Sequence, residues 1–278
     1  MPDSNTPFSP PRVALVGFGE AGSTFARSGG WQGHARGWDV LAERRAAMAD
    51  CGVDAAADPA AALAGADIVL SLVTADAALP AAQDYAALLP AGALWCDLNS
   101  VAPQTKRAAA EAIAAAGGRY VDVAVMAPVD PAALDVPLLL AGEHAGAAET
   151  ALKALGFGKT RIVGEEIGRA SAIKMIRSVM VKGLEALTSE CAAAAQAAGV
   201  FDEVMASLDA SEKAIGWAAK TAYNKERMDT HGLRRAAEME EVCKTLAALG
   251  IEPVMSEGTV KLQRRAGEGA RTRKDQAA

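Results

Sequence analysis

Residues 13–22, Val13-Ala14-Leu15-Val16-Gly17-Phe18-Gly19-Glu20-Ala21-Gly22, decide the fold of the N-terminal part of the chain. Four apolar residues followed by glycine are typical of a buried parallel strand. Residues 17–22 fit the spacing G-x-G-x-x-G, and residues 20–27 have a helical pattern. In such a turn Gly17 permits the tight bend, Gly19 lets a pyrophosphate approach the backbone, and Gly22 lets the helix pack closely on the strand. The stretch therefore predicts a dinucleotide-binding turn whose residues 17–22 contact the cofactor.

Strand and helix patterns alternate through the first 165 residues. Strands are expected at residues 35–38, 68–73, 93–98, 120–125 and 136–141, with Ala-rich helices at 40–50, 76–89, 102–116 and 146–155. Strands that alternate with helices of this length indicate right-handed βαβ units and a parallel sheet. The predicted fold class is therefore α/β, with a Rossmann dinucleotide-binding domain over residues 12–165 and an unstructured leader at 1–11.

The pattern becomes all-helical after residue 165. One long helix is expected over residues 167–198, and Gly199 is placed to end it. Further helices are expected at residues 201–208, 211–222 and 231–249. These segments predict an all-α C-terminal domain over 166–262, followed by a charged tail at 263–278 that we expect to be disordered. The buried stripe of the long helix is expected to contain Ile173, Ile176, Met180, Leu184 and Leu187.

The composition excludes several classes of protein. The 278 residues carry a formal net charge of −6, which argues against a dedicated nucleic-acid binder. We find no uncharged apolar run of about 18 residues, so no membrane span is expected, and no secretory signal is visible. The four cysteines form no CxxC motif and the three histidines lie far apart, so we expect no bound metal and a cytoplasmic location.

Asp39 lies 20 residues after Gly19, at the end of the second expected strand. A carboxylate there accepts hydrogen bonds from the adenosine ribose and repels a 2′-phosphate, so it favours NAD over NADP. NADP stays open because three basic residues lie near enough to reach such a phosphate: Arg36, Arg44 and Arg45. Two further expected cofactor contacts follow at the end of the strand at 68–73, namely Val73 and Thr74.

Three further segments carry a resemblance to a known family. They are residues 97–103 (DLNSVAP), 122–128 (DVAVMAP) and 168–178 (GRASAIKMIRS). Together with the glycine turn they make residues 12–260 resemble the β-hydroxyacid dehydrogenases, such as 3-hydroxyisobutyrate dehydrogenase and, more distantly, 6-phosphogluconate dehydrogenase. Residues 231–242 (HGLRRAAEMEEV) are similar to a poorly characterised branch of that superfamily. The resemblance implies a small-molecule substrate and a helical domain through which subunits form a homodimer or a larger homo-oligomer.

The first two segments imply substrate and nicotinamide contacts. Residues 97–103 are similar to the family's D-x-S-T-x-x-P, which implies Ser100 near the nicotinamide and Asn99 near the substrate. The same residues also fit a helix start. Residues 122–128 stand where the family has D-A-P-V-S-G-G, which implies substrate contacts from Asp122, Val125, Met126 and Ala127. Because Met126, Ala127 and Pro128 replace a serine and two glycines, we expect a bulkier or less anionic substrate than the family's small hydroxyacids.

The third segment is similar to the family's G-x-G-x-x-x-K-x-x-x-N, which implies that Lys174 is the catalytic lysine. Ala170 and Ser178 replace the second glycine and the asparagine. Independently of the family, Ser171, Lys174 and Ser178 are spaced three and four apart and share one face of a helix. A lysine beside the apolar stripe would be partly desolvated, which lowers the pKa of its ammonium toward the range useful for proton transfer. The alternative is an ordinary solvated lysine.

His231 and Arg235 are two further candidates in the C-terminal part. With Glu238 they share a helix face at spacings of four and three. They either reach a substrate acid group, from the same or a neighbouring subunit, or form a surface ion-pair face.

These predictions combine into an NAD(P)-dependent oxidoreductase that interconverts an alcohol, β-hydroxyacid-like or bulkier, and a carbonyl compound. Lys174 is the expected general acid and base, and Asn99 and Ser178 are expected to hydrogen-bond the reacting oxygen or its neighbours. One alternative is an NADPH-dependent reductase of a ketone or an imine, which Arg44 and Arg45 favour. Another is a sensor that binds the nucleotide without catalysis, which the replacements at Met126, Ala127, Pro128 and Ser178 favour.

Overall fold

The computed structural model describes residues 10–211 and 215–277, so most of the expected leader at 1–11 lies outside the described residues. The chain divides into two compact units after Ser178. This division lies within one helix, α7 (Arg169–Ala198), and therefore later than the predicted boundary at residue 165.

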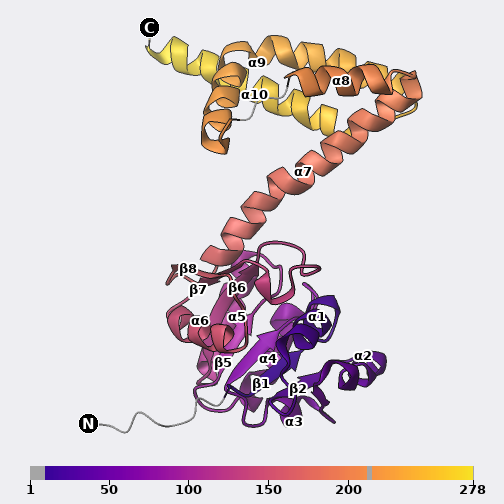
Figure 1. The fold of residues 1–278 in the computed structure, drawn as a ribbon. Coiled ribbons are helices and arrows are strands. Elements are labelled where there is room, and N and C mark those ends of the chain that lie inside the picture. Colours follow the sequence, from indigo (N-terminus) through magenta and orange to yellow (C-terminus); the bar gives the residue numbers. More distant parts are fainter. Residues whose placement is uncertain (1–9, 212–214, 278) are drawn as a thin grey trace. The chain divides into compact units, whose positions relative to one another are not determined.

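The first unit is built on an eight-stranded sheet with the order β3-β2-β1-β4-β5-β6-β7-β8 (Figure 1). The strands are β1 (Val13–Val16), β2 (Ala35–Trp38), β3 (Asp54–Ala55), β4 (Ile68–Ser71), β5 (Leu94–Asp97), β6 (Arg119–Val125), β7 (Leu138–Ala141) and β8 (Thr160–Gly164). The predicted α/β Rossmann fold is confirmed. The sheet is parallel as predicted except at one pair, because β6 and β7 are antiparallel. The two edge strands β3 and β8 were not expected, since neither has a continuous apolar run.

Helices cover both faces of this sheet. Side chains of α1 (Glu20–Gly29) and α6 (Ala145–Ala154) pack in the core on one face. Those of α3 (Pro59–Leu63), α4 (Ala78–Tyr85) and α5 (Pro103–Ala115) pack in a second core on the other. A short helix α2 (Ala42–Ala46) follows β2 and has no buried residue. The first strand is buried over its whole length, as expected of a parallel strand covered on both sides.

The second unit is helical. After α7 it contains α8 (Phe201–Ser211), α9 (Trp217–Ala248) and α10 (Val254–Ala277). The predicted helices at 211–222 and 231–249 are replaced by the single helix α9, although residues 212–214 lie outside the described residues. The prediction of a disordered tail from residue 263 is wrong up to residue 277, because α10 runs through it and packs along α9 (Figure 1). Gly199 ends α7 as predicted, with a φ of +70°.

The apolar stripe of α7 is exposed rather than buried. Ile176 is 72% exposed, and Met180, Leu184 and Leu187 are between 43% and 47% exposed. Only Ile173 of the expected stripe packs against a core cluster. None of the described helices is long and apolar enough to cross a membrane.

Candidate active site

The glycine turn has the geometry that its sequence predicts. Gly17 has a φ of +89°, and a Cβ there would lie 2.6 Å from the carbonyl oxygen of Leu72. A Cβ on Gly22 would lie 2.9 Å from the carbonyl oxygen of Gly17, so the helix lies close to the strand. A Cβ on Gly19 would meet nothing within 4 Å. Gly19 also begins α1 without any side-chain cap, which leaves backbone N–H groups free to bind a phosphate.

A cavity of about 410 Å³ lies beside this turn. Its lining includes five of the predicted cofactor residues: Gly17, Gly19, Asp39, Val73 and Thr74. It is mostly apolar elsewhere, with Leu41 and Tyr85 among the walls. An apolar pocket that adjoins an uncapped helix N-terminus fits the adenosine end and the pyrophosphate of NAD(P).

Asp39 supports the glycine turn directly. Its carboxylate accepts hydrogen bonds from the backbone N–H of Phe18 at 2.7 Å and of Leu41 at 2.9 Å. Each carboxylate oxygen has a second lone pair, so the side chain can still accept from a ribose hydroxyl. Asp39 is a predicted cofactor contact, and the structure adds its contact with the glycine turn.

The three nearby arginines have different positions. Arg45 is held by the carbonyl oxygens of Asp39 and Val40, and its guanidinium lies 4.8 Å from the centre of the Trp38 ring. Arg36, on β2, faces another hollow. Arg44 lines the cavity beside the glycine turn, which we call the cofactor cavity because NAD(P) is its predicted occupant.

A second hollow of about 460 Å³ adjoins this cavity, and residues 72 and 73 line both of them. Its lining includes Glu20, Ala21, Val73, Asn99, Ser100, Val125, Ala127 and Lys174, all of them predicted site residues. Leu98, Pro128 and Val129 add apolar walls. The fold thus brings the expected catalytic lysine to the glycine turn and to the segment after β5.

Lys174 makes the central contact of this second hollow, which we call the cleft. Its Nζ donates a hydrogen bond to Ser100 Oγ at 2.5 Å, and the side chain is partly buried. Asn99 is 5% exposed, and its amide group donates to Asp97 Oδ1 at 2.7 Å and to Ser71 Oγ at 3.0 Å. Its Oδ1 has no hydrogen-bond partner. Asn99 can therefore add only a hydrogen-bond acceptor.

Several predicted site residues do not line the cleft. Asp122 is fully buried, and its Oδ2 accepts from the backbone N–H of Gly168 and Ser171. Met126 packs against a small core cluster, and Ser178 Oγ donates to the carbonyl oxygen of Lys174. His231 and Arg235 lie on α9, in the second unit.

The sequence reasoning predicted no role for a buried lysine of this region. Lys106 on α5 is fully buried and contacts both Asp97 and Asp122. The sequence does contain an indication of its burial. The spacing of Lys106 to Ala109 and Ile113, both buried, places this lysine on the apolar stripe of the helix.

Cys96 lies next to this group but is not a nucleophile. Burial, reinforced by the charge of Asp97, raises the pKa of the Cys96 thiol to about 12. Among residues 10–211 and 215–277, no group of three or more His, Cys, Asp or Glu side chains is arranged to hold a metal ion.

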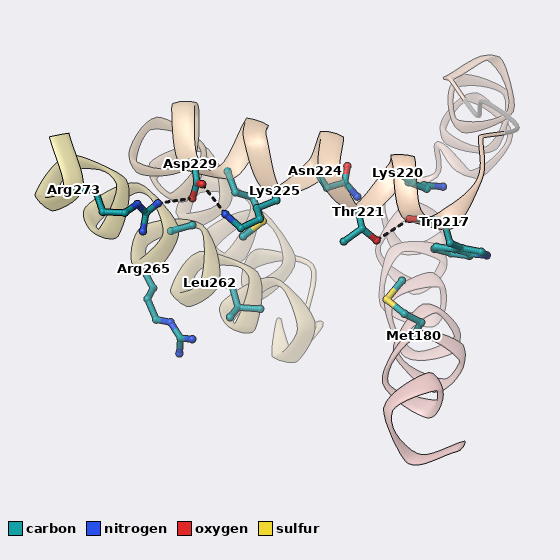
Figure 2. Close-up of a pocket in the computed structure, with 12 residues that line it drawn as sticks. Met180, Trp217, Lys220, Thr221, Asn224, Lys225, Asp229, Leu262, Arg265 and Arg273 are labelled. Atoms are coloured by element: carbon teal, nitrogen blue, oxygen red, sulfur yellow. Dashed lines mark hydrogen bonds and ion pairs between the residues drawn. The ribbon is translucent and has the colours of Figure 1, made fainter. Parts of the chain in front are cut away.

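The helical unit has a hollow of its own, of about 550 Å³, lined by α7, α9 and α10 (Figure 2). Asp229 lies between Lys225, at 3.1 Å, and Arg273, at 3.3 Å. The hydrogen bond from Lys225 lowers the pKa of Asp229, which makes it a poor base. Trp217 and Leu262 remain more than half exposed. Since Asp229 is a poor base and the apolar side chains are open to solvent, we place the candidate chemistry in the cleft instead.

Comparison with known proteins agrees with this geometry. Residues 12–164 match the family model described as the NAD binding domain of 6-phosphogluconate dehydrogenase. The chain belongs to this family. Residues 195–266 match a second model, a domain of unknown function designated DUF1932.

Solved structures extend the likeness of this family member to nearly the whole chain. A conserved hypothetical protein from Sinorhizobium meliloti 1021 is 38% identical, with a TM-score of 0.61, and the match covers 92% of this chain and 88% of that one. The conserved protein MTH1747, described as structurally similar to 3-hydroxyacid dehydrogenases, is 29% identical with a TM-score of 0.60 and coverages of 94% and 98%. An imine reductase from Myxococcus stipitatus in complex with NADP⁺ has a TM-score of 0.75 at 19% identity, with coverages of 93% and 95%. This last likeness concerns the fold alone.

Proposed function

We propose that the protein is an NAD(P)-dependent oxidoreductase that interconverts an alcohol and a carbonyl compound, with Lys174 as the general acid and base. The observation that carries this proposal is the contact between Lys174 Nζ and Ser100 Oγ in a cleft that shares residues 72 and 73 with the cofactor cavity. A proton-transferring amine thus lies in the hollow next to the one that fits the nucleotide.

The chain's own residues bind and orient the reactants and move one proton. Bound NAD(P) supplies the hydride chemistry. In the direction of oxidation, neutral Lys174 takes the proton of the substrate hydroxyl, and in reduction its ammonium returns a proton to the carbonyl oxygen. Ser100 holds the amine in place by accepting its hydrogen bond. Asn99 Oδ1, the acceptor without a partner, is suited to a donor on the substrate or on the carboxamide of the nicotinamide.

The cleft walls support a substrate with an apolar part. Leu98, Val125 and Pro128 line it, and among its lining residues the charges come from Lys174 and Glu20. An anionic substrate would be attracted by Lys174 and repelled by Glu20. Ala127 and Pro128, which stand where the family has two glycines, line this cleft and fit a bulkier and less anionic substrate than a small hydroxyacid.

A second candidate function is the NADPH-dependent reduction of a ketone or an imine. Arg44 supports it, because this arginine lines the cofactor cavity and its guanidinium suits a 2′-phosphate. Asp39 supports NAD, since its carboxylate lies at the same cavity. The fold is shared with an imine reductase that binds NADP⁺. We propose NAD as the favoured cofactor for the alcohol reaction and NADPH for the imine reaction.

The experiment compares wild type with Lys174→Ala and, as a matched control, Lys153→Ala, which removes an exposed lysine of α6. Turnover is followed at the nicotinamide absorbance band on a panel of hydroxyacids, alcohols, aldehydes, ketones and cyclic imines. Loss of Lys174 should lower kcat by roughly 10²–10⁴-fold while the Kd for NAD(P) stays close to wild type. Equal activity in the variant would refute the role of Lys174. Cofactor binding without turnover on the whole panel would favour the sensor.

We also propose that the protein forms a homo-oligomer through its helical unit, as the resemblance implies. Val179, Met180, Leu184 and Leu187 form a strip along α7 in which each side chain is at least 43% exposed. Contiguous apolar surface of this kind marks an association site, and we assign it to a second copy of the chain. Light scattering should give at least a dimer mass, and Leu184→Glu should lower it. A monomeric wild type would refute the assignment.

A further inference from the structure

Lys106 is the most unusual side chain of the first unit. It projects from the second turn of α5 and is 0% exposed, at a helix position whose neighbours Ala109 and Ile113 belong to the core. A buried ammonium is costly unless charged and hydrogen-bonding groups surround it. Its partners therefore indicate why a lysine stands at this position.

These partners lie on two neighbouring strands and comprise two aspartates and, at 3.5 Å, the carbonyl oxygen of Val123. Lys106 Nζ lies 2.6 Å from the carbonyl oxygen of Asp97, 3.0 Å from Asp97 Oδ1 and 3.5 Å from Asp122 Oδ1. Asp97 and Asp122 are register partners in the parallel pair β5–β6, so their carboxylates are held side by side. Two such carboxylates repel each other, and the ammonium between them offsets that repulsion. Lys106 therefore ties the two strands together at this point.

Asp97 is hydrogen-bonded to a residue on one side of the cleft. Its Oδ1 accepts hydrogen bonds from the backbone N–H of Asn99 at 2.9 Å and from the amide group of the same residue at 2.7 Å. Its Oδ2 accepts from the Tyr120 hydroxyl at 2.6 Å. Burial, reinforced by the charge of Asp97, raises the pKa of Tyr120, so the phenol remains a donor. Asp97 thus holds the residue next to Ser100.

Asp122 is hydrogen-bonded to the backbone on the other side of the cleft, where Lys174 lies. Its Oδ2 accepts hydrogen bonds from the backbone N–H of Gly168 and of Ser171, each at 3.1 Å. These groups belong to the N-terminal end of α7, where a carboxylate is favoured by the helix dipole. Lys174 lies three residues after Ser171, one turn further along the same helix. Asp122 thus holds the turn that precedes the catalytic lysine.

We infer that Lys106 is a positioning residue that sets the separation between Ser100 and Lys174. The inference rests on the proposed function of Lys174. Lys106 touches neither of them, but it joins the carboxylate that holds the Ser100 side to the carboxylate that holds the Lys174 side. Without the ammonium, the repulsion between the two carboxylates is no longer offset and they move apart, which loosens one side of the cleft. Lys106 therefore affects the reaction indirectly, because it fixes the backbone next to Ser100 and the turn that precedes Lys174.

The test uses Lys106→Met, which keeps the length of the side chain and removes its charge, with Lys153→Met as the control at an exposed position. Two quantities are measured on folded protein, well below its melting temperature: kcat, and the rate at which trace acetic anhydride modifies Lys174, read by mass spectrometry against the exposed Lys159 in the same sample. We expect kcat to fall roughly 10- to 100-fold while the Kd for NAD(P) is unchanged. We expect the modification of Lys174 to rise severalfold as its contact with Ser100 is loosened.

A second variant separates positioning from mere stability. If Lys106→Met fails to fold, Lys106→Met combined with Asp122→Asn removes one charge of each sign and keeps an acceptor for Gly168 and Ser171. A positioning role predicts that this double variant folds but keeps the low kcat and the fast modification of Lys174. Recovery of both quantities to wild-type values would overturn the inference. If the wild type turns over no substrate at all, the proposed function fails, while the modification rate still decides the role of Lys106.

Discussion

Gly17→Ala and Gly19→Ala together test the geometry of the glycine turn, because the structure predicts a loss of stability for the first and a loss of cofactor affinity for the second. At Gly17 the backbone has a φ of +89°, and a new Cβ would lie 2.6 Å from the carbonyl oxygen of Leu72. At Gly19 the φ is −80° and a new Cβ would meet nothing within 4 Å. The first change alters the folded protein itself, and the second alters only the space left for a ligand.

The expected magnitudes follow from these two environments. The left-handed backbone costs an alanine about 1–2 kcal/mol. Relieving the overlap with the backbone of Leu72 adds about 1–3 kcal/mol. Gly17→Ala should therefore lower the free energy of unfolding by roughly 2–5 kcal/mol, a large share of the total stability of a typical domain. Gly19→Ala loses only the mild preference for glycine at a helix start, about 1 kcal/mol or less.

The assay is urea unfolding of each variant without cofactor, followed by titration of the folded protein with NAD⁺ and NADP⁺. Gly19→Ala should retain near wild-type stability and lose at least about tenfold in cofactor affinity, since its methyl group occupies the approach to the helix N-terminus. Equal loss of stability in both variants would refute the geometric argument. So would a Gly19→Ala protein that binds both cofactors as tightly as wild type.

Three further predictions concern single side chains. Arg44→Ala should raise the Kd for NADP⁺ more than that for NAD⁺, because Arg44 lines the cofactor cavity; an equal change for both, by calorimetry, would count against a 2′-phosphate contact. Cys96 should resist a thiol reagent in the native protein at pH 8, since burial raises the pKa of its thiol to about 12; modification as fast as in urea would contradict its burial. Burial opposes the ionisation of Glu190, but hydrogen bonds from Ser256 and from the N–H of Met255 outweigh it and lower the pKa of Glu190 below 4.5. Its contribution to stability is thus complete above pH 4.5 and is lost as the pH falls through the lower folded-state pKa, so Glu190→Gln should weaken the acid dependence of unfolding.

The parts of the fold that sequence reasoning predicted are those that local chemistry dictates. The strand at residues 13–16 and the turn at 17–22 are specified by apolar and glycine residues that are adjacent in sequence. The end of α7 at Gly199 is specified in the same way. The family resemblance singled out Ser100 and Lys174, and the fold brings these two residues within hydrogen-bond distance.

Helix α10 was missed because its stability comes from a neighbour. Its residues from 263 onward are polar and charged, so no local pattern favours burial there. The structure packs it along α9, where Gly232 and Gly267 let the two backbones approach; a Cβ on Gly267 would lie 2.7 Å from the backbone nitrogen of Leu233. For α7 the error is the opposite one, since the stripe was predicted to be buried and is exposed. Helical spacing identifies an apolar face but not the surface that covers it.

In the candidate site, the contacts of the buried Lys106 likewise could not be predicted from local sequence patterns. The family resemblance implied a substrate contact from Asp122, yet its carboxylate contacts Lys106 and the first turn of α7. A lysine and two aspartates that are 9, 16 and 25 residues apart in the chain give no local pattern. They meet because β5 and β6 are in register and α5 packs across both strands. A charged residue at a core position of an amphipathic helix therefore indicates that an oppositely charged partner lies nearby. Which residue is the partner depends on which strand the sheet topology places beneath the helix.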